Sequence, residues 1–240
     1  MTKVSKFSKK IVISIFVILL YFIWPFVSDF VLGLFGMSYD SITNVGASMG
    51  QFISYMIMNF ILMGILMVIY FRSLKSDFVI FKSKFSSYWK LILKYVGLTF
   101  LSVIGVNLLK IFVFQIDINT GAENDMALYN YFMHVPWAMF FMTTVYYPIV
   151  EELVFSKSIR DLTHNKWLFI IVSSLFFWYF NIAFIGINYV TIVSSLSYFV
   201  IAFIRCYAYD KTDNVCVPIS IKVLYNLIVN IFTLLGMAGL

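Results

Sequence analysis

Long apolar runs fill most of the chain, and short polar stretches separate them. Each run extends over roughly the 17–25 residues that a helix needs to cross the hydrocarbon core of a bilayer. The runs are too long and too uniformly apolar for the alternating strands of a membrane barrel. The pattern therefore predicts an all-α, polytopic transmembrane bundle of about seven helices. We place these helices at residues 11–27, 52–71, 91–114, 137–159, 168–185, 189–204 and 215–235.

The composition is that of a membrane protein. Hydrophobic residues make up 62% of the sequence and charged residues 12%, with a mean hydropathy of +0.94. These values lie far outside the range of soluble globular proteins. No polar block is large enough for a soluble domain, so we expect one membrane domain overall. Residues 1–136 hold its first three helices, and residues 137–240 hold the four that follow.

Basic residues gather before the first predicted helix and in alternate connections. They are Lys3, Lys6, Lys9 and Lys10; Arg72, Lys75, Lys82, Lys84 and Lys90; Lys157, Arg160 and Lys166; and, after the sixth helix, Arg205 and Lys211. The intervening connections hold Asp40, Asp117, Glu123 and Asp125, with no lysine or arginine. The positive-inside rule then predicts a cytoplasmic N-terminus. The net charge of +6 is thus a topology signal, and we expect no nucleic-acid partner.

Two adjacent glutamates, Glu151 and Glu152, lie inside the fourth predicted helix. A charged residue at the centre of a membrane helix costs roughly 2.5–3.5 kcal/mol on insertion scales, so each carboxylate needs a partner. At about 1.5 Å per helical residue, Asn181, Lys222 and Asn226 come to a similar depth on other helices. The sequence therefore predicts a polar site inside the bundle.

Residues four apart on a helix share a face, which groups these polar residues further. Glu152 aligns with Ser156, and Lys222 aligns with Asn226. Each residue alone is compatible with an ordinary interhelical hydrogen bond or with a lysine that reaches toward the membrane surface. The glutamate pair is the least compatible with that ordinary role.

Three segments carry recognisable motifs, and the first, residues 148–155, reads Pro-Ile-Val-Glu-Glu-Leu-Val-Phe. This segment resembles the first motif, Glu-Glu-x-x-x-Arg, of the CAAX protease and bacteriocin-processing (CPBP, or Abi) family of intramembrane metalloproteases. Residues 173–181 stand in the place of its second motif, Phe-x-x-x-His, on the next helix. Residues 218–226 stand in the place of its third motif, His-x-x-x-Asn, after a proline.

The sequence departs from the family at the positions that carry its chemistry. In the family, the glutamates and histidines are thought to hold a metal, commonly taken to be zinc, that activates water. Here Ser156 replaces the arginine, while Asn181 and Lys222 replace the two histidines; Glu151, Glu152 and Asn226 are retained. A neutral amide is a poor zinc ligand and an ammonium repels the ion, so we expect no metal.

We expect Lys222 to take over the charge of the missing metal. Its ammonium would neutralise Glu151 or Glu152, while the second carboxylate stays protonated or bonds to Asn181 and Asn226. The other histidines, His134 and His164, lie too far along the chain to restore a metal site.

These observations predict a protease-like protein with a disabled metal site. The resemblance implies a binding or regulatory role, or bacteriocin self-immunity, in a cell membrane. Partners would be membrane lipid and a hydrophobic peptide or membrane protein. An abundance of Phe, Ile, Lys, Asn and Tyr suggests an AT-rich coding genome, which is consistent with a low-GC bacterium but not specific to one.

Two alternatives remain open. In an active CAAX-type endopeptidase, Glu151 or Glu152 would be the general base and Asn226 would stabilise the oxyanion, with zinc as the cofactor if a metal is held. A transporter or channel is the second alternative, because intramembrane Glu and Lys also mark ion pathways.

Overall fold

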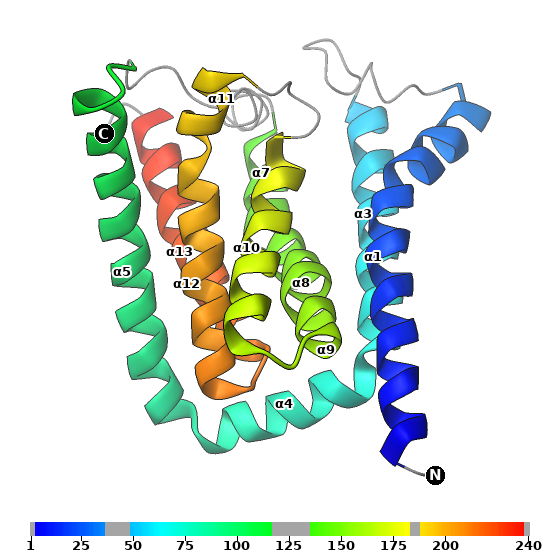
Figure 1. Ribbon diagram of the computed structural model, residues 1–240. Helices are drawn as coiled ribbons and strands as arrows, with labels where there is room; N and C mark the ends of the chain where they lie inside the picture. The colour runs from blue at the N-terminus through cyan, green and yellow to red at the C-terminus, as the bar shows by residue number, and fades with distance from the viewer. Residues whose placement is uncertain (1–2, 37–48, 117–134, 183–187, 238–240) are drawn as a thin grey trace.

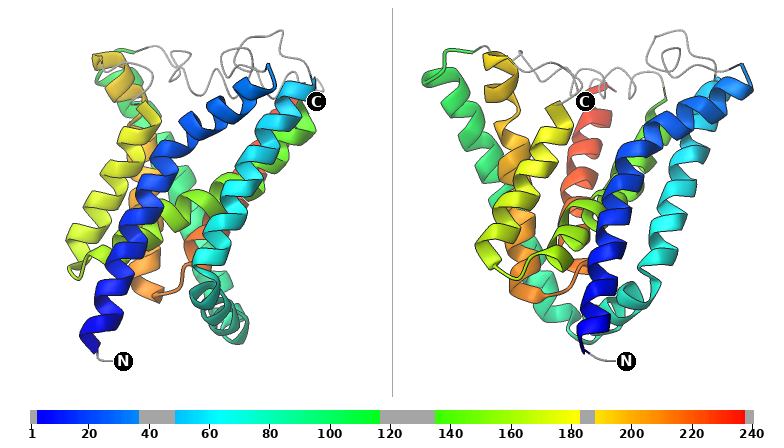
Figure 2. Two further views of the ribbon diagram at one scale, coloured as in Figure 1. Left: turned by 90° about the vertical axis from the view of Figure 1, so that its right-hand side faces the viewer. Right: turned by 45° about the vertical axis from the view of Figure 1, so that its right-hand side comes forward.

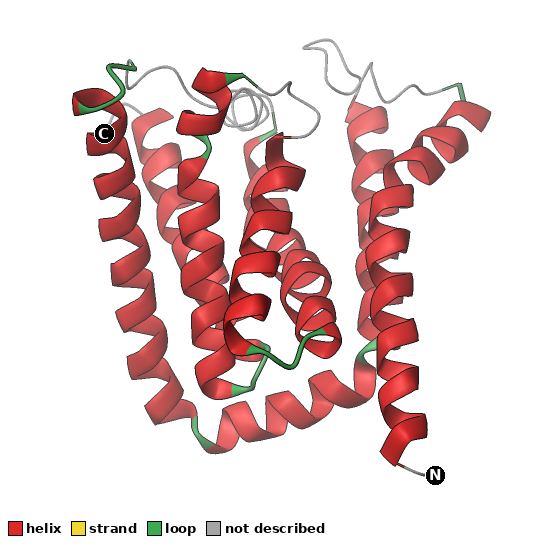
Figure 3. Cartoon of the chain, in the orientation of Figure 1, coloured by secondary structure: helices red, strands yellow, loops and turns green. Residues whose placement is uncertain are grey.

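The computed structural model describes residues 3–36, 49–116, 135–182 and 188–237. Every regular element in these ranges is a helix, which confirms the all-α prediction (Figure 3). The helices are α1 (Lys3–Leu34), α3 (Met49–Ile69), α4 (Phe71–Ser83), α5 (Phe85–Phe112), α7 (Pro136–Phe141), η1 (Met142–Tyr146), α8 (Tyr147–Glu151), η2 (Glu152–Ser158), α9 (Ile159–Leu162), α10 (Lys166–Ile182), α11 (Tyr189–Ser194), α12 (Leu196–Thr212) and α13 (Cys216–Met237), as Figure 1 shows.

Helices long enough to cross a membrane make up most of the described chain. Five segments are sufficiently long and apolar, and α3 with α4 forms a sixth if that bent pair is one span. The five are Lys9–Leu34, Phe85–Phe112, Pro136–Leu162, Tyr189–Thr212 and Cys216–Gly236. The apolar helix α10 is shorter, at 17 residues. The protein is therefore a multi-pass membrane protein, while the number of seven crossings and the cytoplasmic N-terminus stay predictions.

The central helical segment, residues 136–162, is the most enclosed of these spans. Its apolar window is 61% buried, against at most 44% in the other four spans. Residues of α1, α3, α10 and α12 share one apolar core with it, and α5, α12 and α13 form a second core beside it. The segment that carries the glutamate pair is thus shielded by neighbouring helices.

The helix α4 was not predicted as a separate element. It bends away from α3 by 79° and lies across the end of the bundle near the N-terminus (Figures 1 and 2). None of its residues is buried, and it combines exposed apolar side chains such as Phe78 with basic Arg72, Lys75 and Lys82. This composition is typical of a helix that lies in the membrane interface.

The end of the bundle beside α4 also carries the turn between α9 and α10 and the turn between α12 and α13 (Figures 1 and 2). The basic connections of the sequence therefore share one end of the molecule, as their alternation requires. The acidic residues Asp40, Asp117, Glu123 and Asp125, together with His134, lie outside the described residues.

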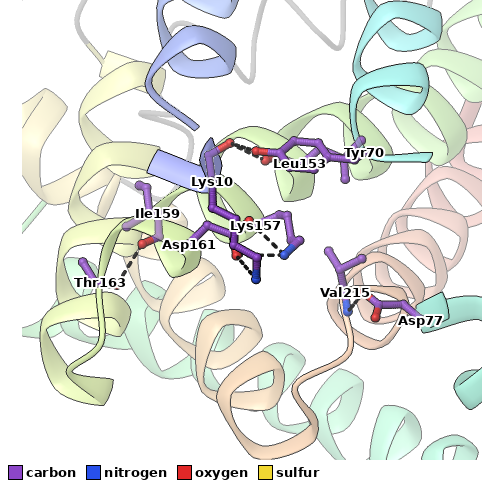
Figure 4. A network of polar contacts seen from close by, with 10 residues as sticks. Lys10, Tyr70, Asp77, Leu153, Lys157, Ile159, Asp161, Thr163 and Val215 are labelled. Carbon is purple, nitrogen blue, oxygen red and sulfur yellow. Dashed lines mark hydrogen bonds and ion pairs between the residues drawn. The ribbon is translucent and has the colours of Figure 1, made fainter. Parts of the chain in front are cut away.

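Polar contacts fasten the elements together at this end (Figure 4). Asp161 accepts hydrogen bonds of 3.0 and 2.9 Å from the Lys157 ammonium and lies 3.7 Å from Lys10 of α1. The hydroxyl of Tyr70, at the break between α3 and α4, lies 2.8 Å from the Ser158 hydroxyl, which donates to the Leu153 carbonyl. These contacts hold α1 and the α3–α4 corner against the central segment.

The turn before α13 is fixed to α4 in a similar way. The Asn214 amide donates to the Asp77 carbonyl over 2.7 Å. The Val215 amide donates to the Asp77 carboxylate over 3.3 Å (Figure 4). Asp77 thereby places a negative charge at the start of α13, where the helix dipole favours it.

Candidate functional site

Two π-helical segments, η1 and η2, interrupt the central helix on either side of Glu151. Such bulges widen the helix locally and often occur at functional sites. Adjacent residues of a helix point about 100° apart, because one turn takes 3.6 residues. The side chains of Glu151 and Glu152 can therefore contact different neighbouring helices.

Glu151 forms an ion pair with Lys222 of α13, between Oε2 of the carboxylate and Nζ of the ammonium. The two side chains are 13% and 8% exposed, so this pair is largely shielded from solvent. Lys222 faces the glutamate pair as the sequence predicts. The structure identifies its partner as Glu151, a choice that the sequence left open.

Glu152 forms a second ion pair, with Arg205 of α12. Arg205 Nη1 lies 2.6 Å from Glu152 Oε1, and both side chains are only 2% exposed. The Ser156 hydroxyl donates a 2.5 Å hydrogen bond to the other carboxylate oxygen, which confirms the shared face of these two residues. The second carboxylate is thus held by an arginine and a serine.

The position of Arg205 corrects two expectations. The sequence placed Arg205 in the polar connection after the sixth helix, but α12 continues to Thr212, so the arginine lies about two turns inside it. The second carboxylate was expected to stay protonated or to bond to asparagines. Among the described residues, neither Glu151 nor Glu152 hydrogen-bonds to an asparagine; each carboxylate forms an ion pair with a cation instead.

The ring of Phe177, on α10, lies close to both cations. Its centroid is 4.7 Å from Cζ of Arg205 and 4.9 Å from Nζ of Lys222. The negative face of an aromatic ring attracts a cation at such distances, and more strongly where water is excluded. Four helical segments thus meet around a cluster of two carboxylates and two cations, whose formal charges sum to zero. We call Glu151, Glu152, Arg205 and Lys222 the charge cluster.

Asn226 has a role in the backbone of the central helix. The Tyr147 N–H donates to Met142 in the π-helical register, and Pro148 has no N–H, so the Thr143 carbonyl loses both of its usual donors. The Asn226 amide donates to that carbonyl over 2.6 Å. One turn further along α13, Asn230 donates to the hydroxyls of Thr143 and Thr144.

Asn226→Ala should therefore destabilise the protein by about 1–3 kcal/mol, because a buried carbonyl loses its partner. Thermal unfolding of the purified protein in detergent measures this change. Thr233→Ala is the control on the same helix, because Thr233 bonds only to its own helix near an exposed surface. Equal losses in the two variants would contradict this role for Asn226.

The hydrogen bond of Asn181 is made within its own helix and not to the charge cluster. Its amide donates to the Phe177 carbonyl, one turn earlier in the same helix, over 2.8 Å. The structure thus joins Glu151 with Lys222 and Glu152 with Ser156, while Asn226 serves the π-helical backbone and Asn181 its own helix.

One family model, described as type II CAAX prenyl endopeptidase Rce1-like, matches residues 133–228. This segment is therefore similar to the Rce1-like CAAX protease family. No curated protein and no solved structure matches the chain. The family segment includes all four residues of the charge cluster and Asn226, and it contains the three motifs from which the sequence predicted the resemblance.

The zinc that the CAAX protease family implies does not fit the residues of this segment. A zinc site uses neutral histidines, thiolates or free carboxylates, and a catalytic one has three protein ligands. Here Lys222 and Arg205 engage the carboxylates and add two positive charges beside them. Within the described residues, no three His, Cys, Asp or Glu side chains gather at one point.

Proposed function

We propose that this protein is a non-catalytic member of the CAAX protease family, whose scaffold binds a partner in the membrane. The observation that supports this proposal is the pairing of both glutamates with cations, Glu151 with Lys222 and Glu152 with Arg205. A general base must accept a proton from water. A neighbouring cation stabilises the charged form of a carboxylate and so makes it a weaker base.

The amide of Asn226, which would have to stabilise the oxyanion during hydrolysis, already forms a hydrogen bond within the protein. An oxyanion requires hydrogen-bond donors aimed at the position where its charge develops. The Asn226 amide instead donates to the Thr143 carbonyl. Hydrolysis at this site would require both an ion pair and this hydrogen bond to break.

The partner that we propose is a hydrophobic peptide or another membrane protein. The charge cluster lies on helices that are long and apolar enough to span a membrane, which supports a partner that is itself in the bilayer. Bacteriocin self-immunity and control of a membrane sensor protein are two forms of such a role. Survival of a bacteriocin-sensitive bacterium that expresses the chain tests the first form directly.

Purified protein should neither cleave a prenylated CAAX peptide nor retain stoichiometric zinc. Peptide mass spectrometry and elemental analysis measure the two properties. The combined variant Asn181→His and Lys222→His supplies both histidines of the family motifs, and zinc or cleavage that appears only in this variant would identify the two substitutions as the cause of inactivity.

Cleavage by the natural chain would point to the active alternative. Its control is Glu151→Gln combined with Lys222→Met, which removes a carboxylate and its cation together and so leaves no unpaired charge. Cleavage by the natural chain that this double variant abolishes, with its thermal stability preserved, would overturn the proposal and assign Glu151 to catalysis.

A further inference from the structure

A second polar feature lies at the basic end of the molecule, away from the charge cluster. A cavity of about 870 Å³ is lined by residues at the end of α4, the start of α5 and the end of α12. Figure 1 shows the corner at which α4 turns into α5. Four lysines line it: Lys84, Lys90, Lys94 and Lys211. The residues that line this cavity include no aspartate or glutamate. We call this cavity, together with the residues that line it, the lysine cavity.

Within the described part of the chain, the four ammonium groups have no acidic partner. Among the described residues, none of the four lysines forms an ion pair with a carboxylate, and Lys211 lies 5.6 Å from the Tyr207 ring. Four like charges around one cavity repel one another, and an anion placed between them relieves that repulsion. The cavity therefore favours an anionic occupant.

The cavity also offers donors suited to phosphate. Ser86 and Ser87, in the first turn of α5, are among the residues that line it. The residue before this helix, Lys84, makes no capping hydrogen bond with its side chain. The first N–H groups of α5 thus have no side-chain cap, and such N–H groups favour phosphate oxygens.

An apolar row on α5 runs directly beside the lysines. Ser86, Lys90 and Lys94 recur every four residues and share one face of the helix, and Phe85, Trp89 and Leu93 recur in the adjacent row. Phe85, Trp89 and Leu93 are 52%, 40% and 48% exposed, and the rings of Phe85 and Trp89 stack at 6.0 Å. Aromatic side chains are typical of the level at which membrane and water meet.

We propose that the lysine cavity binds the phosphate headgroup of an anionic phospholipid, whose acyl chains lie along Phe85, Trp89 and Leu93. The lysine ammonium groups and serine hydroxyls donate to the phosphate oxygens. The adjoining apolar row distinguishes a lipid from free phosphate, which has no apolar part to bury. Basic pockets between membrane helices suit such headgroups. This proposal is independent of the proposed function.

The test measures retention of phosphatidylglycerol by the full chain, using native mass spectrometry after purification from mixed phosphatidylglycerol and phosphatidylcholine. Lys90→Gln combined with Lys94→Gln should weaken retention about 25-fold, from about fivefold for each lysine near an anionic surface. The matched control is Lys75→Gln combined with Lys82→Gln, which removes the same charge from exposed positions of α4 outside the cavity. The control should retain phosphatidylglycerol as the natural chain does.

Other outcomes would overturn the proposal. Equal loss in the control would show that charge at this end of the molecule acts without a specific site. Displacement of the lipid by inorganic phosphate would assign the cavity to a free anion. Unchanged retention in Lys90→Gln with Lys94→Gln would exclude the cavity. Because both lysines are exposed, thermal unfolding of this variant should match the natural chain, which separates lost binding from lost folding.

Discussion

Arg205→Met should lower the free energy of unfolding by about 3–5 kcal/mol, the range measured when one partner of a buried ion pair is removed. The substitution leaves Glu152, which is 2% exposed, with a serine hydroxyl as its hydrogen-bond donor and no cation. Methionine fills much of the space of the arginine side chain, so the lost charge dominates the effect. Unfolding in mixed detergent micelles, followed by circular dichroism, measures the change.

The control for Arg205 is Lys211→Met on the same helix. Lys211 is exposed and forms no ion pair among the described residues, so its loss should change stability by less than about 0.5 kcal/mol. Adding Glu152→Gln to Arg205→Met should restore much of the stability, because the unpaired carboxylate then becomes a neutral amide. If Arg205→Met is as stable as Lys211→Met, the pair with Glu152 is not a significant source of stability.

The helices follow from the sequence because hydrocarbon demands long apolar runs. Each of the seven predicted segments overlaps a described helix. The helix α4 was missed because it is amphipathic, and its basic residues resemble those of a connection. The π-helical segments were missed because their hydrogen-bond register depends on tertiary contacts, although Pro148 signals that the regular ladder must break there.

The sequence predicted three of the four residues of the charge cluster, Glu151, Glu152 and Lys222, and missed Arg205. Depth along each helix was sufficient to place Lys222 near the glutamates, since depth follows from the residue count. The rotation of each helix was not available, so the choice between Glu151 and Glu152 stayed open. Arg205 was missed because it directly follows the predicted sixth helix. Apolar Cys206, Tyr207, Ala208 and Tyr209 come after it, and they are the signal that the helix continues.

Arg205 also bears on how this chain departs from the CAAX protease family motif that it resembles. The family motif supplies an arginine four residues after the second glutamate, where this sequence has Ser156. Here a guanidinium reaches Glu152 from α12 instead, and Ser156 donates to the second oxygen of the same carboxylate. The two residues together provide the positive charge and the hydrogen bond that Glu152 needs while buried.

Lys222→Met should also cost about 3–5 kcal/mol, because Glu151 would lose the cation that neutralises it. The second substitution that restores the stability lost in Lys222→Met distinguishes the two ion pairs. Glu151→Gln should restore much of the stability lost in Lys222→Met, whereas Glu152→Gln should add a second loss, since Arg205 then has no carboxylate. For Arg205→Met the pattern reverses: Glu152→Gln rescues and Glu151→Gln does not.

This pattern of rescue distinguishes two specific ion pairs from a cluster in which either cation can pair with either carboxylate. The four single variants and four double variants, unfolded under the same conditions, give one coupling energy for each pair. Strong coupling is expected for Glu151 with Lys222 and for Glu152 with Arg205, and weak coupling for the two crossed combinations. Equal coupling in all four combinations would mean that the carboxylates exchange cations. Such exchange would leave a carboxylate transiently free, which is the condition that the proposed non-catalytic role excludes.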